Sequence, residues 1–156
     1  MPDPLTPQQL QKVHRLIDQV AERQRNDFGH IVSDVKPDGS LITACDRWSD
    51  AAFVEGLAEI APGEGVLSEE GSQECPTSSA YWVVDPLDGT TNFLHGLPHW
   101  AVSVALEHKG QVVAGVVYDP AKDEMFFAEK GGGAFMNDTR LRVSGRSRMI
   151  EGLFRF

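Results

Sequence analysis

The residues most able to do chemistry lie together in one segment, VVDPLDGTTNF, which runs from Val83 to Phe93. An apolar run delivers Asp85 at its end, and Asp88 follows three residues later. The proline between them fixes a bend and removes a backbone donor, so a tight turn can aim both carboxylates at one point. Gly89 permits an unusual backbone angle, and the polar residues after it open a helical turn whose free amides face the same point.

Such a turn combines a cation site with an anion site. Magnesium prefers oxygen ligands such as carboxylates and keeps several positions for water and phosphate, and helix N-termini bind anions. The segment therefore predicts a metal-assisted phosphate site, in which two metal ions about 4 Å apart polarise phosphoryl oxygens and stabilise a leaving alkoxide. The alternative is that the string forms only a capped turn, because Asp, Pro and Gly are the residues that turns contain.

Two helices are predicted before this segment. The first runs from Pro7 to about Phe28, with Thr6 as the N-cap. Its apolar residues recur at spacings of three and four and are Leu10, Val13, Leu16, Ile17, Val20 and Ala21. The second helix runs from Asp46 to Ile60. The face that we expect it to bury consists of Trp48, Ala51, Ala52, Val54, Leu57 and Ala58.

Strands are predicted around and after the segment. The apolar or β-prone runs with strand length are Gly65–Ser68, Tyr81–Val84, Trp100–Glu107, Gln111–Tyr118 and Glu124–Ala128, and Ile31–Asp34 is a short extended piece. Turn residues separate them at Lys36–Ser40, at His108–Gly110 and at Asn137-Asp138, and Gly131–Gly133 reads as a flexible connector. Two helices followed by a largely antiparallel sheet predict an α+β fold.

Composition narrows the class of protein. The chain has 156 residues, of which 41% are hydrophobic and 24% charged, as in a soluble globular protein. Its net charge of −9 argues against a nucleic-acid partner, because phosphate backbones attract basic surfaces. It has no apolar run of about 18 residues and no basic and apolar leader, so neither a membrane span nor a secretory signal is predicted. Cys45 and Cys75 are expected to be reduced thiols in a cytoplasmic protein.

Several motifs together resemble the inositol monophosphatase family, a magnesium-dependent, lithium-sensitive superfamily. DPLDGTTNF resembles the family signature, and GVLSEE resembles its acidic pair after a short strand. Lys36 followed by LITACD resembles the N-terminal lysine and T-x-x-D element, and GGGAFMN resembles the G-x-G-A-F-x-N stretch. The resemblance implies the first half of the layered αβαβα fold that is shared with fructose-1,6-bisphosphatase.

The resemblance also implies roles in metal binding. Glu69, Asp85 and Asp88 would be metal ligands, and the backbone carbonyl of Leu87 would be another. Glu70 would lie close by and help to hold outer waters. Judged from the residues alone, Glu70 could equally be a solvated neighbour of the site.

Other roles concern the attacking water and the phosphate. Thr90 and Asp46 would orient and activate the water, the amides of Gly89 and Thr90 would hold the phosphate, and Lys36 would support the site electrostatically. The plainer alternatives are that Asp46 caps the second helix and that Lys36 is an ordinary loop lysine. The histidines at positions 95 and 99 are expected to shape the entrance, because magnesium disfavours imidazole.

By resemblance, the chain is a Mg²⁺-dependent phosphomonoesterase that hydrolyses a small phosphate monoester, such as inositol monophosphate, with two or three Mg²⁺ ions in a complete site. Relatives also act on fructose bisphosphate and histidinol phosphate, so the identity of the phosphorylated polyol or sugar stays open. No nucleic-acid or membrane partner is expected, and the intact family implies a homodimer.

One family element is not found. The family's second half carries W-D-x-A-G, whose aspartate binds the second metal, and these 156 residues contain no such string. We expect residues 1–148 to form an N-terminal catalytic domain and residues 149–156 to begin a C-terminal domain. The chain is then a fragment of an enzyme, a partner of another chain that supplies the second half, or a non-catalytic half-domain that binds metal and phosphate.

Overall fold

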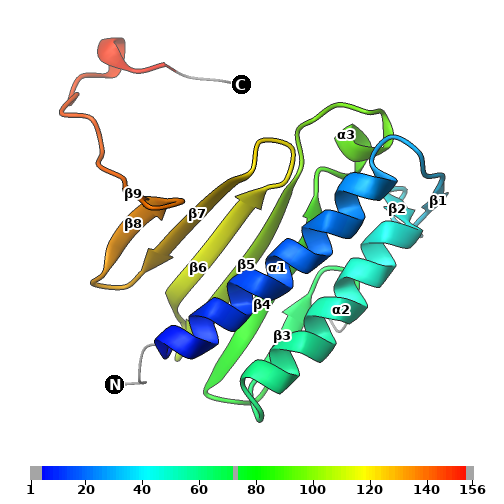
Figure 1. Ribbon diagram of the computed structural model, residues 1–156, viewed down its shortest axis with the longest axis horizontal. Helices are drawn as coiled ribbons and strands as arrows, with labels where there is room; N and C mark the ends of the chain where they lie inside the picture. Colours follow the sequence, from blue (N-terminus) through cyan, green and yellow to red (C-terminus); the bar gives the residue numbers. More distant parts are fainter. Residues whose placement is uncertain (1–4, 72–73, 154–156) are drawn as a thin grey trace.

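The computed structural model describes residues 5–71 and 74–153 and shows two long helices packed on one face of a sheet (Figure 1). The helices are α1 (Pro7–Asp27) and α2 (Ala44–Ile60). The sheet has the order β3-β4-β5-β6-β7-β8-β9, and only its β3–β4 pair is parallel. The predicted α+β fold is confirmed. No helix within the described ranges has the length and apolarity that a membrane crossing requires.

The strands of this sheet are β3 (Gly65–Ser68), β4 (Ala80–Asp88), β5 (Ala101–His108), β6 (Gln111–Asp119), β7 (Glu124–Glu129), β8 (Gly133–Met136) and β9 (Thr139–Arg140). A separate hairpin consists of β1 (Ser33–Val35) and β2 (Leu41–Thr43). The remaining helical elements are the short helix α3 (Thr90–Leu94) and a 3-10 turn (Met149–Glu151). All five predicted strands are present. The predicted flexible connector Gly131–Gly133 is instead the tight turn of the β7–β8 hairpin, in which the amide of Gly132 donates to Glu129.

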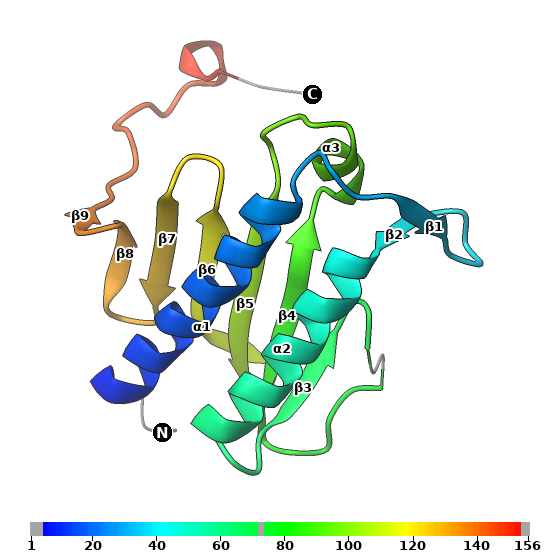
Figure 2. The ribbon, with the colours of Figure 1, turned by 45° about the vertical axis from the view of Figure 1, so that its right-hand side comes forward.

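Helix α1 begins where the sequence predicts. Thr6 is the N-cap of a capping box in which its side chain accepts a hydrogen bond from the Gln9 amide and the Gln9 side chain accepts one from the Thr6 amide. The buried stripe of α1 comprises Val13, Ile17, Val20, Ala21 and Gln24. It packs on the sheet face that carries alternate residues of the central strands, among them Trp82, Val84, Val102, Val104 and Val116 (Figure 2).

Helix α2 begins at Ala44, two residues before the predicted start at Asp46. Thr43 is the N-cap, and Asp46 occupies the third helical position, from which its carboxylate accepts hydrogen bonds from the Thr43 amide and hydroxyl. The alternative in which Asp46 itself caps the helix is therefore wrong in detail. Asp46 is the second member of a capping box, so its carboxylate is fixed by the start of α2.

The predicted buried face of α2 is wrong except at Leu57, which is buried, and Ala52, which is half-buried against the core. Trp48 and Val54 are 38% and 41% exposed, and Ala51 and Ala58 are also exposed. The residues that face the core are Cys45, Asp46, Ser49, Asp50, Phe53 and Leu57. Half of that stripe is polar, so hydrophobic periodicity selects the wrong side of the helix. Burial raises the pKa of the Cys45 thiol to about 12, which keeps it protonated.

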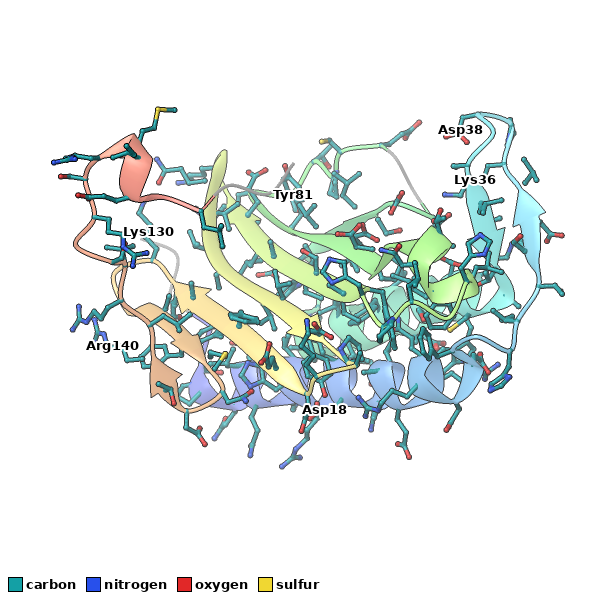
Figure 3. The ribbon with its side chains drawn as sticks, turned by 90° about the horizontal axis from the view of Figure 1, so that it is seen from above. Asp18, Lys36, Asp38, Tyr81, Lys130 and Arg140 are labelled. Carbon is teal, nitrogen blue, oxygen red and sulfur yellow. The ribbon has the colours of Figure 1, made fainter. Side chains whose placement is uncertain are left out.

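The β1–β2 hairpin and the last strands of the large sheet lie at opposite ends of the molecule. The β1–β2 hairpin with Lys36 stands at one end, and Lys130 and Arg140 lie at the other (Figure 3). Beyond β9 the chain runs away from the sheet, where Val143 and Leu153 are almost fully exposed (Figure 1).

The assignment of the buried face of α2 can be tested with two substitutions, one on the buried face and one on the opposite face. Leu57→Ala should lower the free energy of unfolding by about 2–5 kcal/mol, because it leaves a cavity at a fully buried position. Val54→Ala should change it by less than about 1 kcal/mol, since that side chain is largely in water. Urea unfolding followed by circular dichroism measures both. A larger loss for Val54→Ala would mean that the opposite face of α2 is the buried one.

Candidate active site

A cavity of about 260 Å³ lies where the ends of β3 and β4 meet the β1–β2 hairpin and α3. Its lining residues come from separate parts of the chain and are Lys36, Ser40, Leu41, Glu69, Glu70, Leu87, Asp88, Gly89, Thr90, Thr91 and Asn92. All but two of the predicted site residues are in this list. The exceptions are Asp46, which contacts Thr90 directly, and Asp85.

An irregularity in β4 presents the signature residues to the cavity. The strand does not end at Asp85, as predicted, but continues to Asp88. Asp85 pairs with Ser103 and Asp88 with Ala101, so the two residues between the aspartates have no regular partner in the ladder. This bulge bends the strand locally. As a result Leu87 is buried while Asp88 is exposed at the cavity.

Gly89 makes the turn from β4 into α3. It has a φ of +95°, a left-handed value that residues with a Cβ rarely adopt. A Cβ at this position would lie 3.0 Å from the His99 carbonyl oxygen and 3.4 Å from the Trp100 Cα. The turn therefore requires glycine for two reasons, backbone angle and close approach. None of the described side chains caps α3, so the first amides of this helix have no side-chain partner.

A hydroxyl and a buried carboxylate are paired at the cavity wall. The Thr90 hydroxyl donates a hydrogen bond of 2.9 Å to Asp46 Oδ1, and the other carboxylate oxygen accepts from Thr43. Asp46 is fully buried. Because the Thr90 hydroxyl is the donor in its hydrogen bond with Asp46, the lone pairs of its oxygen remain available to accept a hydrogen bond from a water molecule.

An ion pair closes the hairpin side of the cavity. Lys36 Nζ lies 2.7 Å from Glu70 Oε1, with side-chain exposures of 20% and 7%. Burial disfavours the charged lysine, but the hydrogen bond and charge of Glu70 and the charge of Glu69 outweigh it and raise the pKa of Lys36. For Glu70, burial dominates and raises the pKa despite the same pairing. The ion pair favours both charged forms, and Lys36 offsets part of the negative charge of the site.

Asp85 is the least satisfied carboxylate of the group. Its Oδ1 is buried and has no hydrogen-bond partner in the described part of the chain. Burial, a hydrogen bond with Glu69 and the charges of Glu69 and Asp88 raise the pKa of Asp85 to about 7. Three acidic groups near one another thus need a compensating positive charge, which a proton or a cation can supply.

The donor set fits a hard cation, although it does not form a closed cage. Within residues 5–71 and 74–153, no group of three or more Asp, Glu, His or Cys side chains is arranged to hold a metal ion. Asp85 borders a neighbouring hollow along β3 and β4, and Glu69 borders both this hollow and the cavity. The oxygens are of the type that Mg²⁺ prefers. The roles of Glu69, Asp85, Leu87 and Asp88 as metal ligands remain predictions.

The two histidines near the signature lie outside the cavity lining. Both His95 and His99 are exposed. The backbone of His99 contributes to the turn instead, since its carbonyl accepts a 2.9 Å hydrogen bond from the Asn92 side chain.

One buried polar residue behind the site was not predicted. Gln24 in α1 is fully buried, and its side-chain amide donates a 2.7 Å hydrogen bond to the carbonyl of Pro86, inside the signature. The sequence does carry a signal for it. Position 24 continues the buried stripe of Val13, Ile17 and Val20 by four residues, and a polar residue in such a stripe needs internal partners.

The comparisons with known proteins agree with this architecture. The profile of the inositol monophosphatase family matches residues 1–154. The inositol-1-monophosphatases of Mesorhizobium japonicum and Rhizobium meliloti are 50% and 46% identical to the chain, over 80% and 81% of it and 48% and 49% of their own lengths. Nus factor SuhB of Pasteurella multocida is 44% identical over 72% of the chain and 42% of that protein.

Solved structures show the same arrangement. The extragenic suppressor protein suhB from Bartonella henselae superposes with a TM-score of 0.81 at 38% identity, covering 90% of this chain and 56% of that one. The IMPase of Thermotoga maritima gives 0.81 at 35% identity, covering 87% and 54%. The fold and the cavity thus define a protein of the layered inositol monophosphatase fold class. The chain belongs to the inositol monophosphatase family, and it spans about half the length of the curated relatives it matches.

The requirement for glycine at position 89 can be tested by comparison with a second glycine that also has a left-handed backbone angle but has no close neighbour. Gly89→Ala should lower the free energy of unfolding by more than about 1 kcal/mol, because it combines left-handed strain with a contact. Gly39→Ala is the control, since Gly39 has a φ of +86° and nothing within 4 Å of its would-be Cβ. Urea unfolding compares them. An equal loss in both variants would show that the approach of His99 to Gly89 does not constrain the turn.

Proposed function

We propose that the chain carries the catalytic core of a Mg²⁺-dependent phosphomonoesterase. The observation that carries this proposal is the pairing of the Thr90 hydroxyl with the buried Asp46 carboxylate, at the wall of a cavity that also presents Glu69 and Asp88. A hydroxyl held by a carboxylate beside a cluster of hard oxygens is the equipment for directing water at a phosphoryl group.

The metal would be held by oxygen atoms alone. We assign the side chains of Glu69, Asp85 and Asp88 and the carbonyl of Leu87 to this role. The orphaned Asp85 Oδ1 and the raised pKa of its carboxyl support the assignment, because both indicate a site that lacks compensating charge. Bound there, divalent cations supply Lewis-acid stabilisation of the charge on the phosphoryl and leaving oxygens.

Thr90 and Asp46 would direct the nucleophile. Thr90 accepts a hydrogen bond from the attacking water and so fixes the direction of its lone pair toward phosphorus. Asp46, held by the Thr43 amide and hydroxyl, keeps the Thr90 hydroxyl in the acceptor orientation and favours passage of a water proton toward the pair. The water oxygen bonds to phosphorus as the ester P–O bond breaks, and the leaving alkoxide takes up the proton that the attacking water has given up.

The phosphate would be held at the start of α3. Gly89 and Thr90 line the cavity, and we assign their backbone amides as donors to phosphoryl oxygens. Glu70 and its partner Lys36 form the opposite wall, where the ammonium limits the repulsion between the carboxylates and an anionic substrate.

The substrate that we propose is a small phosphorylated polyol or sugar, with inositol monophosphate as the first choice. Its support is the name inositol-1-monophosphatase, which the rhizobial relatives carry. Fructose 1,6-bisphosphate and histidinol phosphate are the alternatives within the same reaction class.

A second candidate function is binding without turnover. It is favoured by the relatives named Nus factor SuhB, because this name is not that of a phosphatase. A half-domain of this kind would take up Mg²⁺ saturably and release no phosphate from any monoester. Turnover that depends on the signature aspartates would support the enzyme instead.

The metal-ligand assignment predicts the effect of one substitution that removes a carboxylate charge and keeps the shape of the side chain. Asp88→Asn should reduce Mg²⁺-dependent phosphate release by about 100-fold or more, equal to about 2.7 kcal/mol, because an amide is a weaker ligand than a carboxylate. The matched control is Asp138→Asn, an exposed aspartate in the β8–β9 turn, which should behave as wild type. Phosphate release is measured from inositol monophosphate, fructose 1,6-bisphosphate and histidinol phosphate. Rates that are equal with and without Mg²⁺ would reject the enzyme for this chain.

The water-directing pair predicts a separation of turnover from metal affinity. Thr90→Val keeps the shape of the side chain but removes the hydroxyl, so turnover should fall by about 10²–10⁴-fold while Mg²⁺ affinity stays near wild type. Thr90→Ser keeps the hydroxyl and should retain most of the activity. Steady-state kinetics with calorimetric Mg²⁺ titration tests both variants. If Thr90→Val and Thr90→Ser were equally active, the hydroxyl would have no part in the reaction.

A further inference from the structure

The side-chain amide of Gln24 links three elements of the fold, α1, α2 and β4, and the residue before β5, behind the candidate site. Its Nε2 lies 2.7 Å from the carbonyl oxygen of Pro86 in β4 and 3.2 Å from the hydroxyl of Ser49 in α2. Its Oε1 accepts a 3.2 Å hydrogen bond from the indole of Trp100, just before β5. All three contacts are buried, so water does not compete with them.

The orientation of this amide is fixed by its partners. An indole N–H can only donate, so the oxygen of Gln24 must face Trp100. The NH₂ group then points at Pro86, whose carbonyl can only accept. The Gln24 amide therefore accepts a hydrogen bond from the Trp100 indole and donates one to the Pro86 carbonyl, and no other orientation of the amide satisfies both partners.

The Pro86 carbonyl is the point where β4 leaves its ladder. Pro86 and Leu87 lie within the bulge between the two paired aspartates, and proline has no N–H of its own. A buried carbonyl without a donor costs free energy comparable to a lost hydrogen bond. Gln24 supplies that donor and thereby fixes the peptide unit that joins Pro86 to Leu87.

The placement of Gln24 in α1 points to the same purpose. The other buried residues of this helix are Val13, Ile17, Val20 and Ala21, all apolar. A polar residue occurs in the buried stripe at the position that faces the bulge, and a long amide spans the gap from the helix to the strand.

We propose that Gln24 is a positioning residue for the candidate metal ligands. Its amide holds the Pro86 carbonyl and so directs the Asp85 carboxylate, the Leu87 carbonyl and the Asp88 carboxylate toward a common cation. This inference rests on the proposed function in treating those oxygens as ligands, and the contact itself is independent of it.

The test uses Gln24→Met in the whole chain. Methionine keeps the volume but removes all three polar contacts, so the dissociation constant for Mg²⁺, measured by calorimetry, should rise by about tenfold or more. Val13→Ala is the matched control, because it opens a cavity in the same buried stripe of α1 without touching the bulge. It should lower stability and leave Mg²⁺ affinity unchanged. Ser49→Ala removes one partner of Gln24 but not the bond to Pro86, and should have little effect on affinity.

A second readout does not involve metal. Amide hydrogen exchange at Leu87, Asp88 and Gly89 should accelerate in Gln24→Met beyond the change in global stability, and Val13→Ala should accelerate exchange only in proportion to that change. Exchange at these amides that simply follows global stability, together with wild-type Mg²⁺ affinity, would overturn the proposal.

The two readouts separate the two claims. If the wild-type chain binds no Mg²⁺, the proposed function fails, and the exchange experiment still decides whether Gln24 holds the bulge. If the wild-type chain binds Mg²⁺ and Gln24→Met binds it equally well, the positioning role fails alone. Should Gln24→Met not fold, Gln24→Asn keeps the amide but retracts it by one carbon, and the same two results are expected.

Discussion

Strand β4 leaves its ladder between Asp85 and Asp88, and the candidate site is built around that departure. Regular pairing would turn successive side chains to opposite faces of the sheet. The bulge instead keeps Leu87 buried and brings Asp88 to the cavity, and the left-handed turn at Gly89 then starts α3 beside it. Two contacts hold this path in place: the chain before β5 lies close to Gly89, and the Gln24 amide donates to the carbonyl of Pro86 in the bulge.

The electrostatics of the site follow from this backbone path. The carboxylates come together in an acidic protein, where Lys36 is the partner of Glu70 and burial raises the pKa of Glu70 and of Asp85. Neutral groups hold the backbone around these carboxylates. At the start of α2, for example, the amide of Thr43 donates a hydrogen bond to the Asp46 carboxylate. The protein thus keeps acidic side chains near one another by anchoring their backbone, and their mutual repulsion is the reason that we propose a cation between them.

Local signals predicted much of this arrangement. The capping box at Thr6 and the β-prone runs determine where α1 and the strands begin, and the signature residues from Leu87 to Asn92 line one cavity together with Glu69, while Asp85 borders the neighbouring hollow. The face of α2 was missed because its buried stripe is half polar and is chosen by the partners it meets, not by hydrophobicity. The bulge and Gln24 were missed for a related reason, since both depend on the register of β4 against β5 and on a helix 62 residues away in sequence from Pro86.

The antiparallel meander from β4 to β9 has a consequence for the order in which the fold forms. Each of its strands pairs with the next along the chain, so these contacts close short loops and form quickly. The cavity instead joins the β1–β2 hairpin to the ends of β3 and β4, and its bulge needs α1 to dock. We therefore expect the cavity to assemble late in folding, and a chain with a formed meander but an undocked first helix would have native strands and no site.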